Sequence, residues 1–467
     1  MARRNRRPAA PDRAAVPRPA GGGAAPTDGS PSAAAPAAAQ PKRSDGAAPG
    51  GVSRRALLAT GGGAAALGLV VGAGGARAVQ GESPTPLSAV GEAAVPFHGR
   101  HQPGITTPAQ AHGHLLGFDL VAAAPADARR SVAALLRRWT ELSAALMAGE
   151  PGDRDTGVAL DAGPSSLTVT IGFGHSFFDA TDLVERRPRA LRPLPNFSAD
   201  ELDGERSDGD LWVAVGADDA LVAFHALRAV QRAADESGAA RLRWQHSGFN
   251  RARGATASPM TARNLMGQVD GTNNPREGDE EFARHVFVPD PDGPGAERST
   301  ARAEEAWMAG GSYVVMRRIR MLLDRWEQEP LTEQEAVIGR RKADGAPLTG
   351  GGETTPVDFD ARTEEGAPVI AANAHVRVSA PESNDGATML RRPFSYHDGF
   401  RDDGAPDAGL LFLCWQADPY RAFVPVQRKL DRGDALSPFL RHEASALFAV
   451  PPGAAKGEYV GQRLLEG

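Results

Sequence analysis

One carboxylate held between two glycines is the best candidate for chemistry in this sequence. Asp270 lies between Gly267 and Gly271, and the surrounding stretch 263–275 holds only one other charged residue, Arg263. Glycines let a backbone turn tightly and come close to a bound group, and a carboxylate placed there can exchange protons with a ligand. An ordinary Asp-Gly turn explains the same residues, so the rest of the chain must decide between chemistry and a turn.

Four histidines between residues 98 and 114 offer a second candidate. His98, His101, His112 and His114 fall within 17 positions. Imidazole nitrogens bind copper and zinc, so a copper or zinc site is one alternative. Three prolines in the same segment favour an extended chain that lies over another part of the protein, and the spacings match no standard site. The single cysteine, Cys414, excludes a disulfide framework and a zinc site built from several thiolates.

The N-terminal region has the composition of an export segment. Residues 1–52 are mostly Ala, Pro and Gly with scattered Arg, which predicts a disordered leader. Two arginines, Arg54 and Arg55, precede an apolar, glycine-rich run that ends near Ala78. Residues 53–78 therefore predict a twin-arginine signal peptide, whereas the weak hydropathy of the run argues against a membrane anchor. We expect export by this route to a secreted or cell-envelope, periplasmic-type location.

Without this region the chain is strongly acidic. Residues 1–78 contain 11 Lys and Arg against 3 Asp and Glu, so the net charge changes from −6 for the whole chain to −14 for the remainder. A surface that follows nucleic-acid phosphates needs the opposite sign. We therefore expect no nucleic-acid partner.

The elements that must position these candidates form a first α+β unit. Apolar residues predict a strand from Leu167 that ends near Gly172 and Gly174, and a second strand over 210–219. Residues 220–238 repeat apolar side chains at helical spacing and end in glycine, which predicts an amphipathic helix. A further strand is predicted over 240–250.

A similar order recurs later in the chain. A strand is predicted from Gly311 that passes into a helix containing Trp326, and further strands are predicted from Asn373 and over 409–418. A glycine- and acid-rich insert at about 342–366 is expected to run over the surface. Two related halves, 79–260 and 261–467, would pack helices on antiparallel sheets and could join in a barrel-like core.

Six sequence motifs, spread over nearly the whole exported part, together resemble one family, the dye-decolorizing peroxidases. The resemblance is closest to the twin-arginine-exported, iron-uptake-associated subgroup. It implies an α+β fold of tandem ferredoxin-like units that form a dimeric α+β barrel, with haem b in the second half. The motifs are PFHGRHQPGI (96–105), RNLMGQVDGT (263–272), GRRKADGAPL (339–348), ANAHVR (372–377), MLRRPFSY (389–396) and LFLCWQADPYRAFVPVQRKL (411–430).

The resemblance also implies roles for individual residues. His375 becomes the proximal haem-iron ligand, although a histidine between small residues could equally be a core residue. Asp270, flanked by cofactor-binding Gly267 and Gly271, becomes the distal group that takes a proton from bound peroxide and returns it to the departing oxygen. Arg391 becomes the distal arginine that stabilises developing negative charge.

Other roles are less sharply defined by the motifs. Arg392 is expected to contact a haem propionate, and Asp418 is a candidate for the carboxylate that hydrogen-bonds the proximal imidazole. Many relatives have an aromatic and a basic residue where this chain has Gln268 and Val269, so the polarity of the distal pocket is expected to differ. Candidates for electron relay to the surface are the aromatic residues Trp326, Tyr396, Trp415 and Tyr420.

The resemblance, with these residue roles, therefore implies a haem peroxidase. Hydrogen peroxide would oxidise bulky organic or dye-like substrates through a ferryl intermediate, with an organic reductant and, during export, the twin-arginine translocase as partners. One alternative is an envelope protein that handles haem or iron and releases iron from haem. The copper- or zinc-binding protein is the other. The sequence leaves open whether the chain forms a homo-oligomer.

Overall fold

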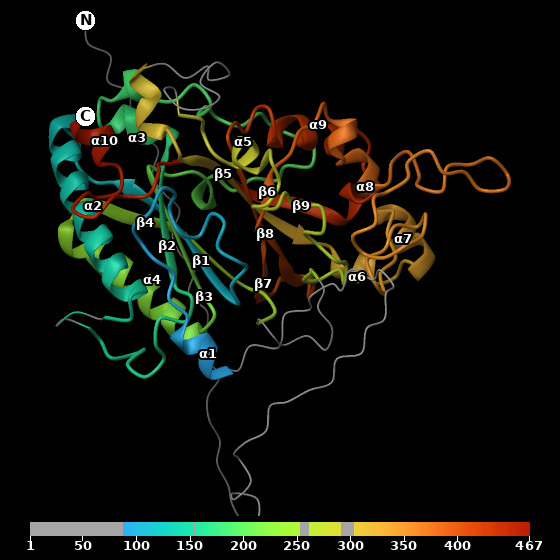
Figure 1. The fold of residues 1–467 in the computed structure, drawn as a ribbon, viewed down its shortest axis with the longest axis horizontal. Helices are drawn as coiled ribbons and strands as arrows, with labels where there is room; N and C mark the ends of the chain where they lie inside the picture. Colours follow the sequence, from blue (N-terminus) through green and yellow to red (C-terminus); the bar gives the residue numbers. More distant parts are fainter. Residues whose placement is uncertain (1–86, 151, 153–154, 253–260, 291–302) are drawn as a thin grey trace, which may run out of the picture. The chain divides into compact units, whose positions relative to one another are not determined.

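A computed structural model describes residues 87–150, 152, 155–252, 261–290 and 303–467 of the chain (Figure 1). These residues belong to one compact unit that spans 78–467. The leader and signal peptide predicted over 1–78, and the boundary predicted between the halves at residue 260, lie outside the described residues.

The first half of the fold is a four-stranded antiparallel sheet with two long helices. Its strands follow the spatial order β2-β3-β1-β4, and the chain runs β-α-β-β-α-β, which is the ferredoxin-like arrangement. The elements are β1 (His112–Leu120), α2 (Pro125–Met147), β2 (Thr168–Gly174), β3 (Leu211–Ala217), α4 (Ala220–Ser237) and β4 (Ala240–Phe249). The helix and the three strands predicted in this region are confirmed.

The second half repeats the same spatial order. Its strands lie side by side in the order β9-β5-β8-β7. Ranked by their order along the chain within the half, these are the fourth, first, third and second strands. The first half has the same arrangement, β4-β1-β3-β2. The elements are β5 (Ser312–Met321), α6 (Leu323–Trp326), α7 (Leu331–Ile338), α8 (His375–Val378), β6 (Leu390–Arg391), β7 (Phe394–Phe400), β8 (Pro406–Gln416), α9 (Phe423–Gly433) and β9 (Leu440–Val450). Three short helices and a long connection thus replace the first long helix of the unit.

Two short seams join the halves into a closed ring of eight strands. β2 pairs with β9 through Phe173 and Gly174, and β4 pairs with β7 through Phe249. β5 also pairs with β8, which closes the ring, and the two-residue β6 adds to β8 outside it. Closure leaves few strand edges unpaired. The predicted fold of tandem ferredoxin-like units in an α+β barrel is confirmed.

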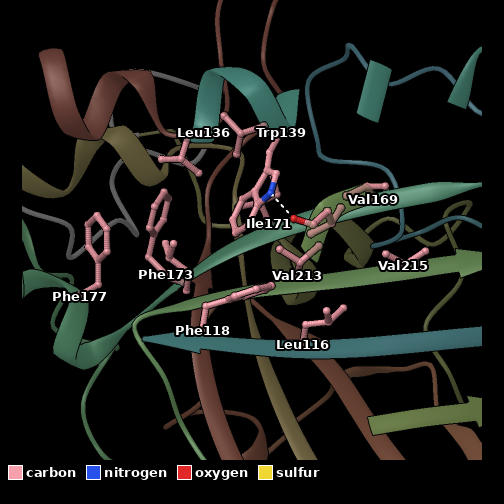
Figure 2. Packing of buried hydrophobic residues seen from close by; sticks show 14 of the residues in the cluster. Leu116, Phe118, Leu136, Trp139, Val169, Ile171, Phe173, Phe177, Val213 and Val215 are labelled. Carbon is pink, nitrogen blue, oxygen red and sulfur yellow. Dashed lines mark hydrogen bonds between the residues drawn. The ribbon is translucent and has the colours of Figure 1, made fainter. Parts of the chain in front are cut away.

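Buried side chains on alternate faces of the strands build two cores. Leu116 of β1 packs in the cluster that contains Trp139 of α2, and Figure 2 shows both side chains. Its neighbour Leu115 belongs to the cluster of Trp212 and Phe448, whose rings stack with centroids 5.7 Å apart. This period of two is the strand pattern, and burial on both faces explains the nearly continuous apolar runs of these strands.

Helix α4 shows why the sequence folds as predicted there. The Asp219 carboxylate accepts hydrogen bonds from the backbone N–H groups of Leu221 and Val222, which caps the start of the helix. Gly238 ends it in a left-handed conformation with φ 63°. The Trp139 indole N–H donates to the Val230 carbonyl over 3.0 Å and so ties α2 to α4.

The remaining helices are short. They are α1 (Leu87–Glu92), α3 (His175–Ala180), α5 (Phe282–Val286), α10 (Gln462–Glu466) and the 3₁₀ turns η2 (Val184–Arg186), η3 (Gly204–Arg206), η5 (Ala303–Met308), η6 (Pro381–Ser383) and η7 (Ser437–Phe439). Within the described ranges, every helix is too short or too polar to cross a membrane.

The strand predicted from Asn373 is wrong. The alternation of Val376 and Val378 with polar residues suggested a strand, but the segment forms the four-residue helix α8. Local hydrogen bonds override the pattern, because the Ser379 hydroxyl donates to the His375 carbonyl and the Asn384 amide donates to the Val378 carbonyl. His375 therefore stands at the first position of a helix instead of inside a sheet.

Candidate active site

The proximal side of the candidate site is a histidine paired with a buried carboxylate. The Nδ1 atom of His375 lies 2.8 Å from Oδ2 of Asp434, whose side chain is only 2% exposed. Asp434 follows the last residue of α9, and its second oxygen accepts the backbone N–H of Leu436. The backbone N–H of Ala435 donates to the carbonyl of Asn373, which ties this turn to α8. With Nδ1 donating to the carboxylate, Nε2 of His375 keeps its lone pair.

Electrostatics at His375 link the two sides of the site. Burial alone would lower the pKa of His375, but the Asp434 carboxylate outweighs it and raises the pKa above its usual value. Arg391 and Asp270 also act on this pKa, the first lowering and the second raising it. The charges of these two distal candidates therefore act on the imidazole, although both residues are far from it in sequence.

Two left-handed glycines shape the loop that carries Asp270. Gly267 has φ 79° and Gly271 has φ 114°, conformations that other residues adopt only with strain. A Cβ at Gly267 would also come within 2.6 Å of the Lys342 side chain. The backbone N–H of Asp270 donates to the Ala262 carbonyl, which closes the loop. The glycines thus serve the shape of the loop, and a direct contact with haem stays a prediction.

The Asp270 carboxylate forms an ion pair with Arg391, the second distal candidate. Its Oδ1 lies 3.2 Å from NH1 of Arg391. Asn274 fixes the backbone of Arg391 twice, because its amide nitrogen donates to the Arg391 carbonyl over 2.7 Å and its oxygen accepts the Arg391 N–H over 3.1 Å. β6 holds Arg391 in register opposite Cys414 of β8. The structure therefore joins Asp270 to Arg391, and the charges of both residues act on His375.

A clamp holds the Asp270 loop against its neighbours. The Arg263 guanidinium donates to the carbonyls of Gly267, Lys342 and Ala343. The Trp326 indole N–H donates to the Met266 carbonyl over 3.1 Å. The start of the predicted surface insert thus packs on the site, while most of its residues from 350 to 366 are exposed, as expected.

The two residues that differ in type from those of many relatives lie in the loop that Arg263 holds. Gln268 is buried, and Val269 packs close to Gly345 of the insert. The expected effect of these residues on the polarity of the distal pocket stays a prediction.

The residues present fit an iron-bound haem. The side chains of His375, Arg391 and Asp270 remain 30%, 28% and 21% exposed. Among the described residues nothing donates to or accepts from Nε2 of His375. One imidazole nitrogen with an open lone pair, backed by a carboxylate, is the donor that a haem iron requires on its proximal side.

The structure places two further residues whose roles were expected from the motifs. Asp418 caps the N–H of Tyr420 and pairs with Arg421, so the expectation that it supports the proximal imidazole is wrong; Asp434 takes that place. Arg392 donates to the carbonyls of Gly104 and Pro108 and thus fastens the N-terminal segment. Its contact with a haem propionate stays a prediction.

The four N-terminal histidines do not assemble a metal site. His98 and His101 face the carbonyls of Ala454 and Gly310, and His114 faces the hydroxyl of Ser247. Burial lowers the pKa of His114 to about 4. The described part of the chain holds no group of three or more His, Cys, Asp or Glu placed to bind a metal ion. The copper or zinc alternative is therefore not supported, and the imidazoles of His98 and His101 instead fasten an extended segment.

The candidate relay residues differ in their surroundings. Trp326, Tyr396 and Trp415 are almost completely buried, whereas Tyr420 is partly exposed and its ring lies 3.7 Å from the guanidinium carbon of Arg192.

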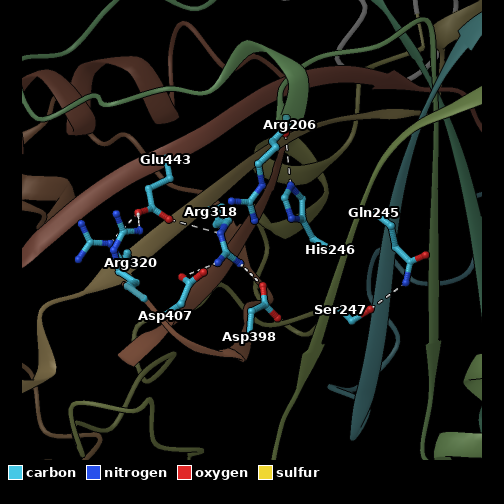
Figure 3. Close-up of polar contacts among 10 residues, drawn as sticks. Arg206, Gln245, His246, Ser247, Arg318, Arg320, Asp398, Asp407 and Glu443 are labelled. Carbon is cyan, nitrogen blue, oxygen red and sulfur yellow. Dashed lines mark hydrogen bonds and ion pairs between the residues drawn. The ribbon is translucent and has the colours of Figure 1, made fainter. Parts of the chain in front are cut away.

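Tyr396 lies beneath a charged network. The guanidinium of Arg318 covers its ring at 3.6 Å and pairs with Asp398 and Asp407, as Figure 3 shows for the ion pairs. Which aromatic residue relays electrons stays a prediction.

Comparison with known proteins identifies the fold and the chemistry. Two family models match this chain, Dyp-type peroxidase, N-terminal, over residues 102–250 and Dyp-type peroxidase, C-terminal, over residues 261–455. The chain belongs to the Dyp-type peroxidase family. It is thus a haem-dependent oxidoreductase that uses hydrogen peroxide and a reducing substrate. The predicted family is confirmed.

Individual relatives of the Dyp-type peroxidase cover most of the chain. The dye-decolorizing peroxidase of Thermobifida fusca is 49% identical over 373 residues, 78% of this chain and 84% of the relative. A deferrochelatase of Escherichia coli strain K12 is 34% identical over 382 residues, 79% of this chain and 87% of the relative.

Solved structures of Dyp-type peroxidases agree with the fold. One from Streptomyces coelicolor and an oxyferrous complex of DtpA from Streptomyces lividans each have 65% identity and a TM-score of 0.77, and each match covers 82% of this chain and 100% of the other.

Sequence reasoning missed three residues of the site. Asp434, Asn274 and Arg263 hold the proximal imidazole, the distal arginine and the Asp270 loop, respectively. Asn274 and Arg263 flank Asp270 in the sequence, so that stretch carried a signal. Asp434 lies 59 positions from His375 and carried none.

Proposed function

We propose that this protein is an exported peroxidase that oxidises bulky organic or dye-like compounds. The observation that carries the proposal is the paired arrangement of the site, with Asp270 and Arg391 in contact near a histidine that Asp434 backs. The 49% identity to a dye-decolorizing peroxidase supports the substrate class.

The chain's own residues can perform the proton transfers that peroxide cleavage needs. Haem, when bound, supplies the iron that receives peroxide and stores its oxidising equivalents. The Asp270 carboxylate accepts the proton from the near oxygen of peroxide and returns it to the far oxygen, which leaves as water. The Arg391 guanidinium, 3.2 Å from Asp270, stabilises negative charge on the departing oxygen.

The proximal pair sets the strength of the axial ligand. His375 donates its Nδ1 proton to Asp434, whose carboxylate raises the basicity of the imidazole and fixes its orientation. A more basic ligand favours the higher oxidation states of iron. A peroxidase needs these higher oxidation states of iron, whereas an oxygen carrier does not.

Dye turnover tests the substrate class. The haem-loaded protein should decolorize an anthraquinone dye only when hydrogen peroxide is present, and Asp270→Asn should reduce kcat by about 100-fold because a positioned acid-base group contributes at least that much. A matched control is Asp418→Asn, which removes a carboxylate that pairs with Arg421 outside the site. Peroxide-dependent turnover that is equal in both variants would contradict the role of Asp270.

Export by the twin-arginine route is part of the proposal. Its support is the sequence Arg54-Arg55 ahead of an apolar run, together with a haem cofactor, because this route carries proteins that are already folded. Lysine at both positions should leave the protein inside the producing cell, whereas lysine at Arg43, upstream of the motif, should not. Equal secretion of the two variants would argue against this route.

Iron release from haem is the second candidate function. The 34% identity to deferrochelatases favours it, and so does the resemblance of the sequence motifs to the iron-uptake-associated subgroup. Incubation of the haem-loaded protein without peroxide separates the two functions. Iron release yields fluorescent metal-free porphyrin, whereas a peroxidase keeps the iron in its haem. Size-exclusion chromatography of the same sample would show whether the protein is a homo-oligomer.

A further inference from the structure

A pocket of about 470 Å³ opens on the surface behind the proximal side of the site. Its walls come from the end of α9, the turn that leads into β9, and the loop 198–201. Pockets of this size accept small organic molecules. Ser198 and Ala199 of the loop are held in place because their backbone N–H groups donate to Oδ1 of Asp431 on α9.

The pocket reaches the group that supports the haem ligand. Asp434 forms part of its wall, and the same carboxylate lies 2.8 Å from Nδ1 of His375. The Asp434 side chain is 2% exposed, so it separates the pocket from the imidazole. A molecule in this pocket would therefore lie one side chain away from the axial ligand, without entering the peroxide side of the site.

The charges around the pocket leave one cation available. Asp431 accepts hydrogen bonds from the 198–199 backbone, Asp434 from His375, and Glu201 pairs with Arg441 at 2.9 Å. Arg432, an exposed residue in the last turn of α9, has no ion pair or side-chain hydrogen bond to any residue that the structure describes. Its guanidinium can form a forked pair with a carboxylate.

The other walls suit an aromatic ring with a hydroxyl group. Leu430 and Pro438 provide apolar surface, and Ser198 and Ser437 provide hydroxyls. A ligand with a carboxylate for Arg432, a ring for the apolar wall and a phenol for the hydroxyls combines these features. Phenolic acids have this chemistry, and they are also donors of single electrons.

We propose that this pocket binds a phenolic acid as a small reducing substrate of the enzyme, at a second site separate from the route used by bulky dyes. The inference rests on the proposed peroxidase function. Each phenol loses one electron to the oxidised cofactor and its phenolic proton to water in the open pocket, and becomes a phenoxyl radical. Two phenols reduce one hydrogen peroxide to two waters, so atoms and electrons balance.

Binding and turnover of ferulate by the haem-loaded protein test the proposal. Calorimetry should detect one ferulate per chain. Arg432→Gln should raise both the Kd and the KM for ferulate by about tenfold, the effect of one charge-assisted pair, with kcat unchanged. Arg428→Gln, a matched loss of charge on the exposed face of the same helix, should change neither constant. Turnover of an anthraquinone dye should be the same in both variants.

A second variant fills the pocket without strain. A Cβ at Gly433 meets no atom within 4 Å, so Gly433→Leu should fold, keep the haem absorption spectrum and abolish ferulate binding. Ferulate binding and KM equal to wild type in Arg432→Gln and Gly433→Leu would overturn the proposal. If wild type oxidises neither ferulate nor dye, the peroxidase proposal fails, and calorimetry still decides whether the pocket binds ferulate.

Discussion

The carboxylate behind the proximal histidine should control how tightly the protein holds haem. In Asp434→Ala the Nδ1 proton of His375 loses an ionised partner 2.8 Å away that is 2% exposed. Hydrogen bonds to charged groups contribute about 1.5–3 kcal/mol, which corresponds to about 10- to 100-fold in an equilibrium constant. Asp434→Asn keeps an acceptor but loses the charge, so its effect should be near the lower limit. We therefore expect haem dissociation about tenfold faster in the Asn variant and up to about 100-fold faster in the Ala variant.

Transfer of haem to excess apomyoglobin measures these rates directly. Asp418→Asn is the matched control, because Asp418 is an acid of the same region that caps the N–H of Tyr420 and not His375. Circular dichroism should show that all variants are folded. Haem loss at the wild-type rate in both Asp434 variants, or an equal increase in Asp418→Asn, would refute the reasoning.

Three further predictions concern the loop and the core. Asn274→Ala removes two hydrogen bonds to the Arg391 backbone and should slow the reaction with peroxide by about tenfold without loosening haem, as stopped-flow absorption would show. Gly267→Ala should destabilise the fold by about 1–2 kcal/mol in urea unfolding, and Lys342→Ala in the same chain should restore only the part due to the 2.6 Å contact. Burial, together with Arg317, lowers the pKa of His442 to about 3, so the folded protein should lose stability as the pH falls below about 6.5. In urea unfolding between pH 7 and 5, wild type should lose on the order of 2 kcal/mol more than His442→Phe. Equal losses in the two proteins would contradict this prediction.

The regular parts of the fold followed from local sequence patterns. Alternation and helical spacing predicted β2, β3, α4 and β4, and caps such as Asp219 and Gly238 agree with those predictions. In these elements the local sequence and the tertiary packing favour the same secondary structure. The 23-residue helix α2 was not predicted, although Pro125 stands at its start and its apolar face packs against α4.

The parts that failed depend on contacts distant in sequence. Segment 373–380 has the alternation of a strand, but hydrogen bonds from Ser379 and Asn384 turn it into α8. The choice of Asp434 over Asp418 as the proximal partner is decided by how α9 ends beside α8, which no spacing in the sequence encodes. In contrast, Asp270, Arg391 and His375 could be named together only through the family resemblance.

The reaction of the haem-loaded protein with one equivalent of hydrogen peroxide tests the central claim most directly. Stopped-flow absorption should show a rapid spectral change without loss of haem in wild type. Asp270→Ala and Arg391→Ala should slow it by about 100-fold or more, and His375→Ala should lose normal haem ligation. If peroxide only bleaches the wild-type haem, or if both distal variants react as fast as wild type, the roles assigned to this site are wrong.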